Sequence, residues 1–118
     1  MSTAANVVIA LVGLLHVYIL VLEMFLWDKP IGLRAFGQTQ AAATASKVLA
    51  ANQGLYNGFL AAGLFWGLSL GAAGLGVKVF FLGCVLVAGL YGGATANRRI
   101  LLIQALPAAI GLALLLIA

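Results

Sequence analysis

The sequence predicts an all-α membrane protein, built as an antiparallel bundle of four transmembrane helices with both termini outside the cytoplasm. Of its 118 residues, 65% are hydrophobic and only 7% are charged. A soluble domain of this size could not hide so much apolar surface, because a small globule keeps most of its residues near its surface. We therefore expect the bilayer to be its solvent, and a single domain over residues 1–118 that crosses a bacterial inner membrane several times.

Four apolar runs define the expected helices, at about residues 5–27, 48–70, 77–96 and 100–118. Each is about the length that crosses a hydrocarbon core, and in lipid each must be helical because no water satisfies its backbone. The connection from Asp28 to Lys47 is the only long one. Pro30 and Gly32 are predicted to end the first helix, and the second helix is expected to begin inside residues 38–46.

Three further residues mark details of these runs. Asn97 precedes the last run and is expected to cap its helix. Pro107 removes the hydrogen bond to the carbonyl of Ile103, which predicts a kink. The single cysteine, Cys84, lies in an apolar run and is expected to be a buried, inert thiol.

The basic residues predict the orientation. The first and third connections carry five of the six, and Lys78 alone lies on the other side; the five are Lys29, Arg34, Lys47, Arg98 and Arg99. The positive-inside rule then places both connections in the cytoplasm and argues against a dual topology. This also accounts for the net charge of +4 without a nucleic-acid partner.

Glycines at four-residue spacing predict where helices meet, because small residues let backbones approach closely in lipid. The first interpretation is packing within the chain, and the alternative is a homodimer through the faces of the second helix. The glycines are Gly54 and Gly58, then Gly63, Gly67 and Gly71, on the second helix, and Gly89 and Gly93 on the third.

Two ionisable residues interrupt the first apolar run, namely His16 near the midplane and Glu23 about one turn from its cytoplasmic end. They are seven residues apart and share one face of the helix. Ionisable groups inside a membrane segment are costly, and their presence indicates function. We predict Glu23 and His16 to be a proton-active pair, with Glu23 the stronger candidate.

Polar side chains on the other helices are expected near the depth of Glu23. We predict that they orient a ligand in a pocket open to the cytoplasm; they are Asn52, Gln53, Asn57, Tyr91 and Gln104. The alternative is purely structural, since Asn, Gln and Tyr commonly link membrane helices at about 1 kcal/mol each.

Other chemistries lack the necessary residues. One His and one Glu two turns apart do not make a helical metal site, and no Ser lies at the depth of His16. No cofactor is predicted, and whether the protein is an enzyme stays open. What remains is proton chemistry at Glu23 and His16.

Three stretches resemble a family of small, four-helix bacterial membrane proteins catalogued as a domain of unknown function. They are Tyr18 with Leu22–Trp27, Asn52–Phe59 and Ala88–Gly92, and the Asn-Gln-Gly-Leu-Tyr-Asn-Gly sequence is the most specific. The resemblance covers nearly the whole chain. It implies the four-helix fold and supplies no activity.

Three functions are compatible with this pattern. The first is binding, and as an extension acid/base transformation, of a hydrophobic small molecule or lipid at Glu23 and His16. The second is a proton-coupled exporter acting as a dimer, by analogy with small multidrug-resistance transporters, which are similar in length and carry one essential Glu in the first helix. The third is a non-catalytic interaction or structural protein that uses its glycine faces.

Overall fold

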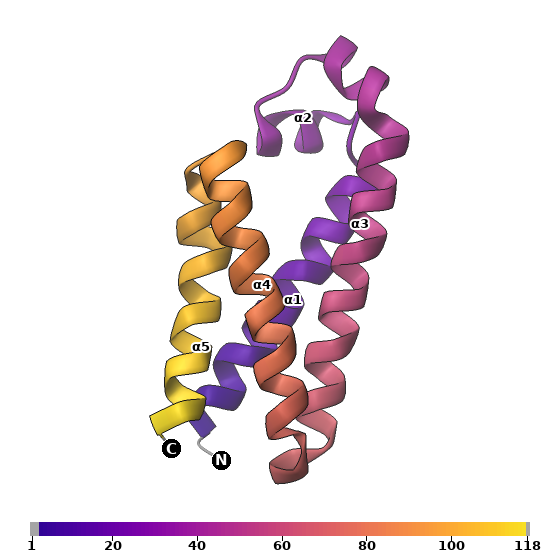
Figure 1. Ribbon diagram of the computed structural model, residues 1–118. Coiled ribbons are helices and arrows are strands. Elements are labelled where there is room, and N and C mark those ends of the chain that lie inside the picture. Colours follow the sequence, from indigo (N-terminus) through magenta and orange to yellow (C-terminus); the bar gives the residue numbers. More distant parts are fainter. Residues whose placement is uncertain (1–2, 118) are drawn as a thin grey trace. The chain divides into compact units, whose positions relative to one another are not determined.

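All regular structure in the computed structural model is helical, and no strand occurs among residues 3–117, which are the residues that it describes (Figure 1). The predicted all-α fold is confirmed. The helices are α1 (Thr3–Phe25), α2 (Pro30–Phe36), α3 (Gln40–Ser69), α4 (Leu75–Thr95) and α5 (Leu106–Ile117). A 3₁₀ turn, η1 (Gly71–Gly74), precedes α4, and a π-helical segment, η2 (Leu101–Ala105), precedes α5.

Two helical segments, Thr3–Phe25 and Gly71–Thr95, are long and apolar enough to cross a membrane, and Leu101–Ile117 forms a shorter apolar helix. The helix α3 is the longest, with 30 residues, but it is less apolar than α1 or α4. The polar residues responsible are mainly Gln40, Thr44, Lys47, Asn52, Gln53 and Asn57.

The chain divides into two compact units. The core unit contains residues 3–14 and 60–117, and the connection unit contains residues 15–59. In the core unit, four helices contribute to one cluster of buried apolar side chains. The cluster contains Ala5, Ile9 and Val12 of α1, Leu64 of α3, Leu82 and Val85 of α4, and Ala108 and Leu115 of α5.

Glycines allow the helices of the core unit to approach closely. The helix α4 runs antiparallel to η2 and α5 (Figure 1), and a methyl group at Gly89 would lie 2.8 Å from the backbone nitrogen of Ala105 in η2. A methyl group at Gly93 would overlap the side chain of Leu101, and one at Gly63 of α3 would overlap the ring of Phe81. These contacts are within the chain, as the first interpretation of the glycine pattern expects. A homodimer through the α3 faces stays a prediction.

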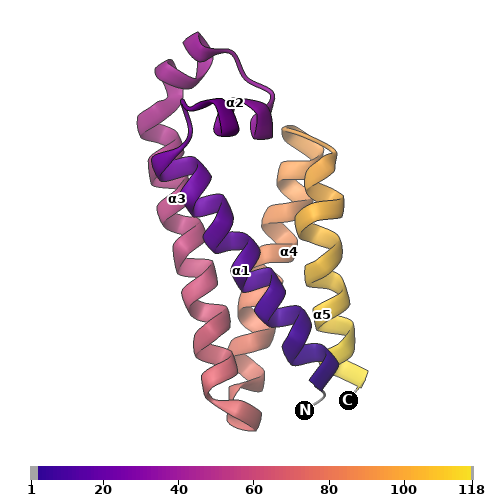
Figure 2. The same ribbon diagram turned by 180° about the vertical axis from the view of Figure 1, so that it is seen from behind.

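In the connection unit, the end of α1 packs against the first half of α3. Figure 2 shows the short helix α2 beyond the end of α1 and beside the first turns of α3, running across α3 rather than along it. Gly32 brings α2 against the end of α1, because a side chain there would collide with the carbonyl of Leu26. Gly37 then ends α2 in the left-handed conformation, with a φ of 62°.

Several predicted boundaries can be compared with the structure. The helix α3 begins at Gln40, inside the stretch where it was predicted to begin. Asn97 accepts a hydrogen bond from the backbone N–H of Arg99 at 2.9 Å, which confirms the expected cap. The helix α2 was not predicted, because Pro30 and Gly32 indicated only the end of α1. Pro30 instead occupies the first turn of a new helix, where its fixed φ is favourable.

The last helix departs from α geometry just before Pro107. Leu101–Ala105 is π-helical, and the N–H of Leu106 donates to the carbonyl of Leu101. Pro107 has no N–H, and its ring would clash with the carbonyl four residues earlier in a regular α-helix. The widened turn therefore accommodates the ring of Pro107, and a kink of the helix axis there stays a prediction.

The glycine contact between α4 and α5 can be tested by two matched substitutions in α4. We expect Gly89→Ala to lower the free energy of unfolding by about 1–3 kcal/mol, because its methyl group overlaps the backbone of Ala105. Gly83→Ala is the control, since nothing lies within 4 Å of a methyl group there. It should raise stability by about 0.5–1 kcal/mol through helix propensity. Unfolding in detergent micelles, followed by circular dichroism, measures both, and equal effects would contradict the packing.

Candidate functional site

The connection unit contains a buried carboxylate held by an amide. Glu23 of α1 is 8% exposed, and its Oε1 accepts a hydrogen bond of 2.6 Å from Nδ2 of Asn57 on α3. The two residues are 34 positions apart in sequence. At 2.6 Å this bond is shorter than most hydrogen bonds between a nitrogen donor and an oxygen acceptor. The pair therefore fixes both the position of the carboxylate and the approach of the two helices.

Two glycines make this contact sterically possible. A methyl group at Gly54 would lie 2.6 Å from Cγ of Met24 and 3.1 Å from Cβ of Glu23. A methyl group at Gly58 would lie 2.7 Å from Cδ1 of Leu20. Gly54 and Gly58 are four residues apart and lie on the same face of α3 as the amide between them, Asn57. The predicted glycine pair thus brings α3 close enough to α1 for a short side chain to reach Glu23.

The second carboxylate oxygen of Glu23 has no hydrogen bond among residues 3–117, and no salt bridge there involves Glu23. No group of three or more His, Cys, Asp and Glu side chains lies together in the same residues. The chemistry that this arrangement offers is therefore that of a single carboxylate. It can accept a hydrogen bond at Oε2, attract a cation, or exchange a proton.

The other predicted residues of the connection unit have different surroundings. His16 is fully buried. Asn52 and Gln53 are exposed side chains of α3. Gln53 is four residues from Asn57 and therefore shares its side of the helix. Of the residues predicted for a site, the structure brings Glu23 and Asn57 into contact, and Asn57 holds the carboxylate where we expected it to orient a ligand.

Two predicted residues belong to the core unit. Gln104 lies in the π-helical segment, and its Nε2 donates to the backbone carbonyl of Val85 on α4 at 3.1 Å. This bond links two helices, which is the structural alternative for that side chain. Tyr91 is 73% exposed on α4. A common depth for these residues and Glu23 stays a prediction.

The core unit also contains a buried cation that the sequence did not single out. Lys78 of α4 is completely buried, and its Nζ donates to Oδ1 of Asn6 at 3.2 Å and to the carbonyl of Gly71 at 3.1 Å. Both acceptors are neutral. The bare backbone of Gly67 leaves room for the aliphatic part of the lysine, because a methyl group there would lie 2.8 Å from Cγ of Lys78. Lys78 thus joins α1, the turn before α4 and α4 itself.

The sequence carries a signal for the burial of Lys78 besides its bearing on orientation. Lys78 lies inside the predicted run 77–96 and is the sole basic residue outside the two basic connections. A charge inside an apolar run is the same kind of signal that identified Glu23. Its partners could not be inferred, because a backbone carbonyl and an Asn 72 positions away carry no local pattern.

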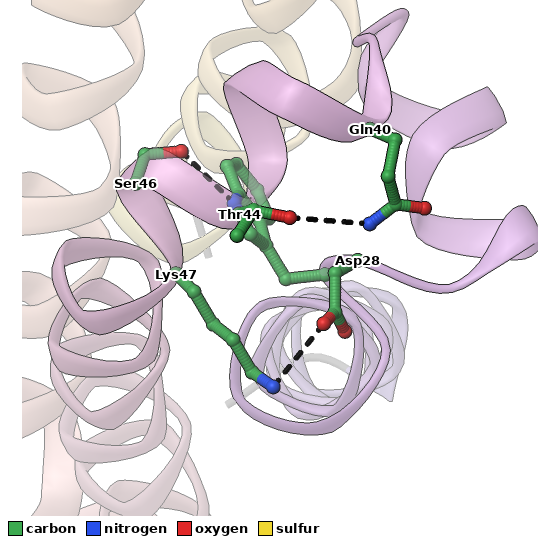
Figure 3. Close-up of polar contacts among 6 residues, drawn as sticks. Asp28, Gln40, Thr44, Ser46 and Lys47 are labelled. Atoms are coloured by element: carbon green, nitrogen blue, oxygen red, sulfur yellow. Dashed lines mark hydrogen bonds and ion pairs between the residues drawn. The ribbon is translucent and has the colours of Figure 1, made fainter.

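A second polar cluster lies in the connection between α1 and α3 (Figure 3). Nζ of Lys47 is 3.2 Å from Oδ2 of Asp28. The hydrogen bond from Lys47, assisted by the charges of Lys47 and Lys29, lowers the pKa of Asp28 below its ordinary value. Asp28 is therefore ionised at neutral pH. The same figure shows the side-chain contact from Nε2 of Gln40 to Oγ1 of Thr44, at 3.3 Å.

Comparison with known proteins identifies relatives of unknown activity. A family described as "Protein of unknown function (DUF1304)" has a model that matches residues 10–116. The uncharacterized protein YpaA of Lactococcus lactis subsp. lactis (strain IL1403) is 32% identical over 96 residues, which are 80% of this chain and 81% of that protein. No solved structure matches. The resemblance to a family catalogued as a domain of unknown function is confirmed.

The Glu23–Asn57 bond can be tested by a double-mutant cycle. We expect Asn57→Leu to lower the free energy of unfolding by about 1–3 kcal/mol, because a buried carboxylate loses its donor. Adding Glu23→Leu should recover most of that loss, since replacing both partners by apolar groups is nearly neutral. Asn52→Leu is the control on the same helix, because Asn52 is exposed, and it should change stability by less than about 0.5 kcal/mol. Simple additivity of the two substitutions would contradict the contact.

The Asp28–Lys47 pair predicts a pH dependence. Because Asp28 titrates below its ordinary value in the folded protein, the pair stabilises above about pH 4 and loses this effect as the pH falls through the folded pKa. We expect Lys47→Met to raise the pKa of Asp28 toward its ordinary value. Lys29→Met should raise it less, because Lys29 contributes only a weaker charge effect. Carboxyl NMR of protein labelled in its single Asp measures both values, and equal shifts would contradict the assignment.

Proposed function

Because the chain belongs to the DUF1304 family, whose function is unknown, we propose its function from its own geometry: it is a membrane protein that binds a hydrophobic small molecule or lipid at Glu23. The observation that carries this proposal is the state of that carboxylate. It is buried, its only hydrogen-bond partner among the described residues is the neutral Asn57, and its Oε2 is left without a donor. A ligand that donates a hydrogen bond or carries a positive charge would supply the missing partner of Oε2.

The free-energy cost of such a carboxylate supports a functional role. An ionised carboxylate that is removed from water needs hydrogen bonds or an opposite charge in place of its hydration. One amide donor replaces only part of the hydrogen bonds that water molecules would make to it. A glutamine at position 23 could bond Asn57 without that cost, if linking α1 to α3 were the only task. A buried carboxyl group with incomplete hydrogen bonding is instead suited to bind a donor or to exchange a proton.

The surface of the long helices supports the membrane placement. Large apolar side chains are exposed on α1, α3, α4 and α5, which suits a surface in contact with lipid tails. They include Val7 and Leu11, Phe59 and Trp66, Phe80 and Val87, and Ile110 and Leu116. The proposal places α1, α3, α4 and η2–α5 across a bacterial inner membrane, with both termini outside. At about 1.5 Å per residue the 30 residues of α3 exceed a bilayer core of about 30 Å, so its polar first turns project beyond it.

Acid/base transformation of the bound molecule is an extension of this proposal. Glu23 would move the proton, and His16, on the same face of α1, is its proposed proton partner. Gln53 is the best placed of the remaining polar side chains to orient a ligand, because it is exposed and one turn from Asn57. A proton-coupled exporter would use the same carboxylate and differs in requiring Glu23-dependent flux across a vesicle under a pH gradient.

The proposal can be tested with dicyclohexylcarbodiimide, an apolar reagent that converts protonated carboxyl groups in apolar surroundings into stable N-acylureas. We expect mass spectrometry of the full chain in detergent to find the adduct at Glu23 and none at Asp28, whose carboxylate is ionised and paired. Glu23→Gln should abolish the labelling. Dodecyltrimethylammonium, which joins a non-nucleophilic cationic group to an apolar chain, should slow labelling at Glu23, and glycerol at the same concentration should not.

Labelling of Asp28 in preference to Glu23 would contradict the proposal, and so would labelling of Glu23 that dodecyltrimethylammonium leaves unchanged. Thr44→Val provides the matched variant, since it alters an exposed polar residue of α3 and leaves the Glu23–Asn57 pair intact. Its labelling rate should equal that of the original protein.

A further inference from the structure

The connection between α1 and α3 is a folded element, not a loose loop. The indole Nε1 of Trp27 donates to Oγ of Ser46 at 3.1 Å, and the ring of Trp27 lies 4.7 Å from that of Phe36, between centroids. Thr39 accepts a hydrogen bond from the N–H of Ala42 and so caps α3. With Gly32 packed on the carbonyl of Leu26, these contacts hold α2 in one place.

The fixed position of α2 gives it an inner and an outer face. Gly32 is buried, and the ring of Phe36, which is 37% exposed, contacts the ring of Trp27, so these residues form the inner face. Ile31 and Arg34 are three residues apart, which places them together on the helix surface, and both are exposed. Lys29 is exposed at the start of the helix. The outer face therefore combines an apolar side chain with two cations.

The charges of this connection do not cancel. Together with the first two turns of α3 it contains three basic residues, Lys29, Arg34 and Lys47, and one acidic residue, Asp28. Asp28 is paired with Lys47, as Figure 3 shows, and no salt bridge among residues 3–117 involves Lys29 or Arg34. Two positive charges thus stay available on the surface that carries Ile31.

We propose that this outer face, formed by Lys29, Ile31 and Arg34, binds the headgroups of anionic phospholipids at the membrane surface. Phosphate oxygens match the donors of a guanidinium and an ammonium group, and a short amphipathic helix with exposed apolar residues lies naturally in the boundary between headgroups and acyl chains. Trp27 follows the end of α1 by two residues, which places an amphipathic ring at the same level. This inference rests on the proposed membrane placement of α1, but not on ligand binding at Glu23.

The two tryptophans of the chain make a selective measurement possible. In a Trp66→Phe background, Trp27 is the single tryptophan and reports on this connection. The full chain is reconstituted into phosphatidylcholine vesicles that contain a minor fraction of either brominated phosphatidylglycerol or brominated phosphatidylcholine. We expect the anionic lipid to quench Trp27 more strongly at equal fraction, and the excess to shrink in about 1 M salt, where charges are screened beyond about 3 Å.

Two double variants distinguish an effect of this face on quenching from an effect of the net charge of the protein. Lys29→Gln with Arg34→Gln should remove the excess quenching, with up to about a thirtyfold loss of preference for the anionic lipid, since each basic residue near an anionic surface contributes about a factor of five. Arg98→Gln with Arg99→Gln removes the same charge from exposed residues of the other basic connection and should keep the excess. Unquenched Trp27 emission and circular dichroism verify that both variants fold.

Equal quenching by the two brominated lipids in the Trp66→Phe protein would overturn the inference. An equal loss in both double variants would overturn it as well, because the effect would then follow net charge and not this face. Carbodiimide labelling of Glu23 is independent of either result, so the failure of one proposal is distinguishable from the failure of the other.

Discussion

The structure depends on one constraint, that a polar side chain buried among apolar helices must find its partner inside the protein. The buried Glu23 and Lys78 and the half-buried Gln104 do so in three ways. Glu23 accepts from a side-chain amide, Lys78 donates to a side-chain carbonyl and a backbone carbonyl, and Gln104 donates to a backbone carbonyl. Each contact joins segments that are distant in sequence or separated by a turn. Because an unpaired group would cost several kcal/mol in such surroundings, these contacts also select one packing of the helices among alternatives.

Glycine and polar residues act together in this arrangement. Gly54 and Gly58 let α3 approach α1 where Asn57 meets Glu23, and Gly67 leaves room for the stem of Lys78. A short side chain such as Asn can bridge two helices only when their backbones are close. The glycine spacing therefore permits the close helix approach that the polar contacts require, and the polar contacts stabilise that approach.

Much of the fold could be predicted, because it follows from patterns within a single segment. The apolar runs predict the long helices, and Asn97 predicts a helix cap that the structure confirms. The helix α2 was missed because it has seven residues and starts with a proline that equally marks an end. At the candidate site, a charge in an apolar run identified Glu23, whereas Asn57 as its partner and the burial of Lys78 depend on contacts across 34 and 72 positions. Such pairings leave no periodic signal in one sequence.

The π-helical segment before Pro107 has a consequence for how the chain can change in evolution. A π turn holds one residue more than the α-helical turn it replaces, so it behaves as a single-residue insertion absorbed within a helix. The residues after it are rotated by about 100° relative to an uninterrupted helix, at 3.6 residues per turn. Relatives without the proline can lose one residue between positions 101 and 105 and keep Ala108, Gly111 and Leu115 on the buried face of α5. Length differences of one residue at this point therefore preserve the core, whereas the same change elsewhere in α5 would turn that face away from it.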